Sequence, residues 1–275
     1  MTGITSSGDT SPGIYAARRR RLLLATAGIT LTSALAPRLL DRPADRVPAD
    51  RRVPAQRRVA AQRRVPAARR VPAHRGPAYP LDRPLYYIDD ASKAIALTID
   101  DGPDPVYTPQ VLRLLHEYGV TATFSMIGLN VAAYPQLARR VAEAGHLIAN
   151  HTWTHADLAP MPAHRVHSEL ARASHAIHAA TGVQPGLFRA PYGAWSAAVI
   201  SQCEHMRMIP LDWSVDPRDW AQPGTRSIVR NIMDNTQPGS IILEHDGGGN
   251  RSQTVAALRI VLPRLLHAGY HFRTP

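Results

Sequence analysis

The stretch KAIALTIDDGP, residues 93–103, decides the fold. From Lys93 to Ile99 it is almost entirely apolar, and such a short run is typical of a buried strand. Asp100 and Asp101 end the run, and Gly102-Pro103 turns the chain sharply. Adjacent carboxylates on a strand point to opposite faces, but a turn can bring both into one site. The stretch therefore predicts a strand that carries two carboxylates at its carboxyl end.

Similar apolar runs recur along the chain and alternate with amphipathic helical patterns. The predicted strands are 93–100, 121–128, 146–151, 186–191, 207–213, 239–245 and 269–274. The predicted helices are 108–118, 132–144, 164–180, 195–203, 225–235 and 252–267. Repeated β-α units predict a parallel α/β sheet with right-handed crossovers. Such units can wind into an open sheet, but we predict that they close into a barrel.

Polar motifs follow the predicted strands, each at the carboxyl end. In chain order they are DDGP, NHTWTH, RAPYG, DWSVDPRDW and EHD. In barrels and in open α/β sheets alike, chemistry collects at this end of the strands. Chance scatter would place some of these groups at the other end. The pattern therefore predicts one site built from five segments.

The pair His151 and His155 has H-x-x-x-H spacing, which puts two imidazoles on one face of a helical turn. The familiar zinc protease motif has a Glu after its first His as the general base, but Thr152 stands here. One of the two carboxylates at 100–101 could complete an Asp-His-His metal set, and the other would then be the base. The alternatives are a structural histidine pair and an acidic turn without a ligand.

Five motifs in this order resemble the polysaccharide deacetylases of carbohydrate esterase family 4. They are TIDDGP (98–103), HTWTH (151–155), RAPYG (189–193), DPRDW (216–220) and ILEH (242–245). Each motif is weak alone, but five in the right order are highly specific, and they cover nearly the whole chain after residue 93. The resemblance implies a distorted (β/α) barrel with a divalent metal, most often Zn²⁺, with Co²⁺ or Ni²⁺ as alternatives.

The resemblance also implies roles for the matching residues. The metal ligands would be Asp101, His151 and His155. Asp100 would be the general base, oriented by Arg189, and His245 would be the general acid, tuned by Asp219. These roles suit amide hydrolysis, since the carbonyl needs an activated water and the amine leaves only after protonation.

Three further residues would contact the substrate. The resemblance implies that Trp220 and Leu243 surround the acetyl methyl group, while the backbone N–H of Tyr192 helps to bind the oxyanion. The chain departs from the family pattern at positions that carry no reacting group, namely Ile99, Ala190 and Ile242. We therefore predict an active enzyme. The run 246–249 after His245 is interpreted as a flexible loop.

The charge of the chain is divided unevenly. Residues 1–75 hold 16 of the 32 Lys and Arg and 4 of the 21 Asp and Glu, a net charge of +12, whereas the other 200 residues have a net charge of −1. A near-neutral body argues against a specific nucleic-acid partner, because a DNA-binding domain carries its own basic face. The single cysteine, Cys203, excludes an intrachain disulfide and a Cys-based zinc cluster.

The basic segment has two parts. Residues 1–36 have the cationic start, apolar stretch and small residues of an export signal, and RRRLL at 19–23 also fits a twin-arginine signal. An uncleaved membrane anchor is the alternative, although the apolar stretch is short for a span. Residues 37–78 form an Arg/Pro-rich, low-complexity linker with a hexapeptide repeat. We interpret this linker as a disordered, solvated spacer with incidental affinity for an anionic cell wall or membrane surface.

We predict that residues 79–275 form the catalytic domain of an exported protein, secreted or associated with the cell wall or membrane. Its substrate would be the N-acetyl groups of an N-acetylglucosamine polysaccharide such as peptidoglycan or chitin. An O-acetyl esterase acting on xylan is an alternative, because the same site can cleave esters. A non-catalytic glycan-binding wall scaffold is a third reading, which the intact Asp100 and His245 disfavour. The oligomeric state is left open.

Overall fold

The computed structural model describes residues 81–89 and 92–275. The interpretations of the export signal and of the hexapeptide repeat concern residues outside this range, and they remain predictions. Within the described residues, no helix combines the length and the apolar character needed to cross a bilayer.

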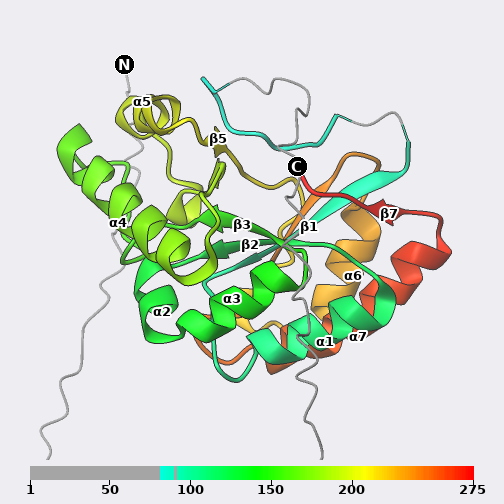
Figure 1. The fold of residues 1–275 in the computed structure, drawn as a ribbon. Helices are drawn as coiled ribbons and strands as arrows, with labels where there is room; N and C mark the ends of the chain where they lie inside the picture. Colours follow the sequence, from blue (N-terminus) through cyan, green and yellow to red (C-terminus); the bar gives the residue numbers. More distant parts are fainter. Residues whose placement is uncertain (1–80, 90–91) are drawn as a thin grey trace, which may run out of the picture. The chain divides into compact units, whose positions relative to one another are not determined.

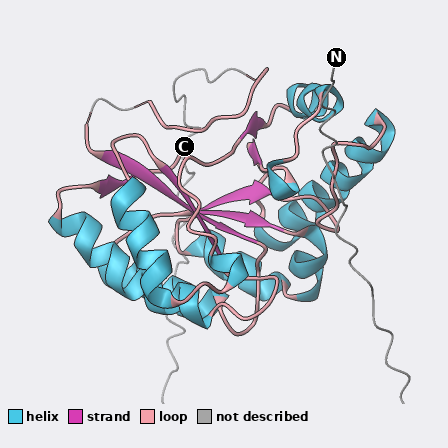
Figure 2. Ribbon diagram, turned by 180° about the vertical axis from the view of Figure 1, so that it is seen from behind, coloured by secondary structure: helices cyan, strands magenta, loops and turns pink. Residues whose placement is uncertain are grey.

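Seven parallel strands form the sheet at the centre of the described residues (Figures 1 and 2). They are β1 (Ala94–Asp100), β2 (Thr123–Met126), β3 (Leu147–Asn150), β4 (Leu187–Phe188), β5 (Ile209–Pro210), β6 (Ile241–His245) and β7 (His271–Phe272). Their order is β5-β4-β3-β2-β1-β6, and β7 pairs with the first residues of β1. The predicted parallel sheet is confirmed.

The two end strands of this order, β5 and β6, are joined by single bridges instead of a continuous ladder. The chain beyond β5 pairs Val215 with Ile242 of β6. The segment before β1 adds a parallel bridge from Leu85 to Leu211 and an antiparallel bridge from Tyr87 to Ser240. The sheet is therefore a distorted barrel, as predicted.

The helices pack outside the strands (Figure 1). They are α1 (Thr108–Tyr118), α2 (Gly128–Ala133), α3 (Pro135–Glu143), α4 (Ala163–Thr181), α5 (Ala197–Met206), α6 (Thr225–Asn235) and α7 (Ser252–His267), with short 3₁₀ turns η1 (Pro191–Gly193) and η2 (Asp219–Ala221). The prediction of one helix over 132–144 is wrong. Helix α2 ends at Ala133 and α3 begins at Pro135, because proline has no N–H for an internal helix bond but suits the first helical turn.

Strand β1 shows how alternation prepares the site. The side chains that pack in the large core with the helices are those of Ile95, Leu97 and Ile99. The opposite face begins with Ala94 and Ala96 and continues with Thr98 and Asp100, since successive side chains point to opposite faces. Ile99 is fully buried among apolar neighbours, so this departure from the family pattern removes nothing from the site.

Candidate functional site

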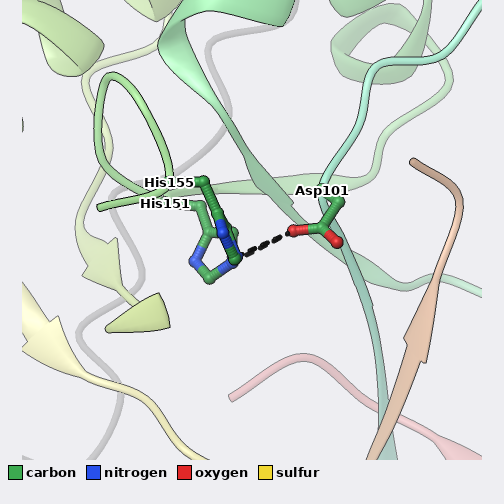
Figure 3. A group of neighbouring side chains, drawn as sticks. All are labelled: Asp101, His151 and His155. Atoms are coloured by element: carbon green, nitrogen blue, oxygen red, sulfur yellow. Dashed lines mark ion pairs between the residues drawn. The ribbon is translucent and has the colours of Figure 1, made fainter. Parts of the chain in front are cut away.

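The carboxylate of Asp101 and the imidazoles of His151 and His155 meet at the carboxyl ends of β1 and β3 (Figure 3). Asp101 Oδ1 lies 3.5 Å from His151 Nε2 and 3.2 Å from His155 Nε2. One ligand atom from each residue lies within 4.8 Å of the other two. This is the nitrogen and oxygen donor set that zinc accepts, and three protein ligands leave a coordination position open.

The two histidines lie in a loop after β3, so the expectation of a helical turn is wrong. Thr152 and His155 have left-handed backbone angles, with φ of 65° and 62°, which swing the second imidazole back beside the first. The Thr152 hydroxyl accepts a hydrogen bond from the His155 N–H at 2.8 Å, and Glu169 accepts from the next two backbone N–H groups, those of Trp153 and Thr154. These bonds hold the loop in its strained form, as is common at functional sites.

Two features fit this group to a metal. His151 Nδ1 lies 2.8 Å from the carbonyl oxygen of Arg189, which can only accept, so Nδ1 carries the proton and Nε2 presents its lone pair to the site. Asp101 Oδ1 is buried and has no hydrogen-bond partner within the described chain.

The second carboxylate, Asp100, is held by a buried guanidinium. Arg189 follows β4 and is fully buried. Its Nη1 donates to Asp100 Oδ1 at 2.8 Å and to the Thr98 hydroxyl at 2.7 Å, while Nη2 donates to the carbonyl of Asp212 at 2.8 Å. Asp100 Oδ2 lies 3.9 Å from His151 Nε2. One carboxylate oxygen is therefore fixed by arginine and the other is directed at the two-histidine site.

His245 ends β6, is the register partner of Asp100 on β1, and is paired with Asp219 at the start of η2. The Nδ1 atom of His245 lies 2.7 Å from Asp219 Oδ1, and Oδ2 accepts from the His245 N–H at 2.9 Å and from the Thr254 hydroxyl at 2.6 Å. Burial alone would lower the pKa of His245, but the hydrogen bond and charge of Asp219 raise it to about 9. Asp219 therefore favours the protonated form of the imidazole.

All of these groups surround one pocket of about 370 Å³, within the range of small-molecule sites. The predicted site residues that line it are Asp100, Asp101, His151, His155, Tyr192, Trp220, Leu243 and His245, and those that lie behind it are Arg189 and Asp219. Tyr192 has a left-handed φ of 63° and stacks edge-on against His155. The structure therefore brings all the sequence-predicted site residues together.

Several buried groups behind the pocket were not found from the sequence. Glu244 is fully buried beside Asp219, and burial and that charge raise its pKa well above the ordinary value. Asp246 is also fully buried and accepts from the Thr108 hydroxyl at 2.6 Å, so the flexible-loop interpretation of this residue is wrong. Arg251 donates to the carbonyls of Gly247 and Trp220 and ties two rim loops together. Glu244 and Asp246 belong to the EHD motif, but the motif does not show that they are buried, because their partners come from distant segments.

Comparisons with known proteins agree with this geometry. The family model for polysaccharide deacetylases matches residues 88–208. The chain is 41% identical over 191 residues to a chitooligosaccharide deacetylase of Bradyrhizobium sp., covering 65% of this chain and 87% of the relative. It is 42% identical over 189 residues to a peptidoglycan-N-acetylglucosamine deacetylase of Bacillus cereus, covering 68% and 88%.

A solved structure shows the same fold. The crystal structure of the Bc1960 peptidoglycan N-acetylglucosamine deacetylase superposes with a TM-score of 0.67 at 32% identity, covering 69% of this chain and 89% of that chain. Since each of these proteins is matched over most of its length, the likeness extends to the complete catalytic fold.

Proposed function

The chain belongs to the polysaccharide deacetylase family, and from this premise we propose that it removes N-acetyl groups from an N-acetylglucosamine polysaccharide of the peptidoglycan or chitin type. The observation that carries the proposal is the meeting of two kinds of group in one pocket. Asp100 lies beside the Asp-His-His set, and His245, whose pKa Asp219 raises, lines the same pocket. Amide hydrolysis needs a proton acceptor for water and a proton donor for the amine.

Asp101, His151 and His155 would hold a divalent metal, with zinc the best match to their donor atoms. When bound, such an ion polarises a carbonyl and lowers the pKa of water from 15.7 to about 7. His151 and Asp101 are almost fully buried, so these two ligands are held in place by the surrounding packing. The left-handed backbone of Asp101, with φ of 72°, turns its carboxylate towards the histidines.

Asp100 would act as the general base. Its Oδ2 takes a proton from the attacking water as the oxygen–carbon bond forms at the acetyl carbonyl. Arg189 holds the other oxygen and fixes the direction of the carboxylate, which keeps the acceptor aligned with the water. Because Arg189 is fully buried, its charge is little screened by solvent.

His245 would act as the general acid. It gives its proton to the amide nitrogen as the carbon–nitrogen bond breaks, so that acetate and a free amine leave. Asp219 keeps the imidazole in the orientation that presents Nε2 to the pocket, because Nδ1 is engaged. We also propose that the Tyr192 N–H donates to the oxyanion and that Trp220 and Leu243 receive the methyl group.

We further propose that the protein is exported by the signal in residues 1–36 and that the Arg-rich linker in residues 37–78 rests against an anionic wall or membrane surface. Deleting residues 42–75 should reduce cell-wall or membrane retention at low salt. Unchanged retention would remove the linker from this role.

The activity is tested by measuring acetate released by the purified full-length chain, loaded with Zn²⁺, from peptidoglycan, chitooligosaccharides and acetylated xylan in parallel. Release from the N-acetylated glycans supports the proposal. Release from xylan alone would make the protein an O-acetyl esterase. If no acetate is released from any of the three substrates while metal is demonstrably bound, a non-catalytic glycan-binding scaffold would be favoured.

A further inference from the structure

Arg218, to which no role has been assigned, pairs with Trp220 at the rim of the pocket. Trp220 is 45% exposed and lines the pocket. The guanidinium carbon of Arg218 lies 5.0 Å from the centre of the indole ring, within cation–π range. Arg218 is itself exposed. The pair thus places a permanent positive charge beside the opening through which a sugar chain reaches the site.

The loop that carries this pair is held by several bonds. Asp216 Oδ1 accepts from the Arg218 N–H at 2.7 Å, and the Arg218 carbonyl accepts from the Ala221 N–H at 3.0 Å. Arg251 Nη1 donates to the Trp220 carbonyl at 3.2 Å. Arg218 adopts a left-handed backbone, with φ of 56°, directly before the buried Asp219. The backbone of Arg218 is therefore held in place, and the contact with Trp220 restrains its guanidinium, which lowers the entropy cost of using it.

No acidic side chain in the described part of the chain neutralises the charge of Arg218. Among residues 81–89 and 92–275, its guanidinium makes no hydrogen bond or ion pair with another side chain; Asp216 bonds only to its backbone N–H. The pocket lining holds three aspartates and three histidines but no lysine or arginine. Asp216 in this wall would repel a negatively charged substrate. Arg218 would provide the favourable charge that such a substrate needs.

We propose that Arg218, stacked on Trp220, binds a carboxylate on the sugar next to the N-acetylglucosamine that is being deacetylated. An arginine fork matches a carboxylate with two parallel hydrogen bonds. The inference rests on the proposed function and narrows its substrate. Chitin carries no carboxylate, whereas peptidoglycan carries one on muramic acid, as the free lactyl group or, when a stem peptide is attached, on that peptide.

The test compares kcat/KM for acetate release by the full-length, Zn²⁺-loaded chain on three glycans of equal length. These are peptide-free peptidoglycan strands with free lactyl groups, strands that keep their stem peptides, and neutral chitooligosaccharides. The variants are Arg218→Gln, Arg218→Lys, and the control Arg230→Gln, which removes an exposed charge from α6 outside the pocket lining.

In Arg218→Gln, the ratio of kcat/KM for charged to neutral glycan should fall about tenfold at low salt, mainly through KM, and less at high salt. Arg218→Lys should recover part of the ratio, and Arg230→Gln should leave it unchanged. If kcat/KM of Arg218→Gln falls only on peptide-free strands, Arg218 binds the lactyl carboxylate. If it falls only on peptide-bearing strands, Arg218 binds a carboxylate of the stem peptide.

Two results would overturn the inference while the proposed function stands: an unchanged ratio in Arg218→Gln, or an equal fall on charged and neutral glycans, which would mean that Arg218 only supports the pocket wall. Absence of acetate release from every N-acetylated glycan by the wild type would instead refute the proposed function, and the inference with it.

Discussion

Replacing Asp219 with asparagine tests how the acid is tuned. Burial lowers the pKa of His245, but the hydrogen bond and charge of Asp219, with smaller contributions from the charges of Asp101 and Asp100, raise it from an ordinary 6.5 to about 9. This net shift corresponds to roughly 3 kcal/mol at about 1.36 kcal/mol per pKa unit. His245 is almost buried, with a side chain 12% exposed, so solvent screens little of this interaction. Asparagine keeps the shape but loses the charge. Its amide oxygen can still accept from the His245 N–H and Thr254, but its NH₂ group then faces His245 Nδ1 and cannot accept from it.

The expected result is a shift of the alkaline limb of kcat/KM to lower pH. At pH 8 an acid with a pKa of about 9 is roughly 90% protonated and one at the ordinary 6.5 is about 3% protonated, so a return to the ordinary pKa sets the scale of the loss in Asp219→Asn at about thirtyfold. The assay is acetate release from N-acetylglucosamine oligomers between pH 5 and 10. Bound Zn²⁺ lowers the pKa of His245 in both proteins, so the difference between their limbs is the readout.

Asp234→Asn is the matched control, since it makes the same substitution at an exposed position on α6. The folded-state pKa of His245 lies above its unfolded value, so the stability contributed by the pair is complete below pH 6.5 and is lost as pH rises through about 9. Circular dichroism should therefore confirm that Asp219→Asn is folded at each assay pH. An alkaline limb that stays in place in a folded Asp219→Asn would refute the assignment of His245 as the acid tuned by Asp219.

Three further predictions concern groups around the pocket. Arg189→Met leaves the buried Asp100 without its cation and should lower the free energy of unfolding by about 3–5 kcal/mol in urea titrations. Adding Asp100→Asn should recover part of this loss; no recovery would mean that the two residues are not coupled. In the folded protein the pKa of Glu244 lies well above 4.5, so its contribution to the free energy of unfolding declines as pH rises above 4.5. Glu244→Gln should therefore be more stable than the wild type at pH 7, by a margin that narrows near pH 5; a difference in stability that does not depend on pH would contradict this. Zn²⁺ at a hundred times its dissociation constant should stabilise the wild type by about 2.7 kcal/mol in thermal unfolding, and His151→Ala should lose most of this gain; equal stabilisation of both proteins would place the ion elsewhere.

The sequence was sufficient for the parallel barrel and for the convergence of the polar motifs on one pocket, because both leave short-range signals. Strand β1 is a buried apolar run that ends in two carboxylates, and the structure places both in the pocket. The other motifs each follow a strand, and parallel strands bring their carboxyl ends to one rim. Knowing the strand order was therefore not necessary to predict that the motifs meet.

What the sequence could not provide depends on contacts between distant segments. The spacing of His151 and His155 suggested a helical turn, whereas a loop with left-handed residues gives the same convergence. Asp246 looked like part of a polar loop, yet it is buried against Thr108, which lies 138 positions away in the chain. Glu244 lies within the sequence of strand β6 with nothing to mark it, and only the fold shows that it lies next to Asp219. A polar residue in a strand does not reveal its burial until its neighbours are known.

The most direct measurement is acetate release by Asp100→Asn from N-acetylglucosamine oligomers, with bound zinc quantified in the same preparation. Asparagine cannot accept the proton of the attacking water, so activity should fall about 10²–10⁴-fold while the metal remains bound through Asp101, His151 and His155. Activity close to that of the wild type, with full metal content, would contradict the assignment of Asp100 as the base and with it the proposed mechanism.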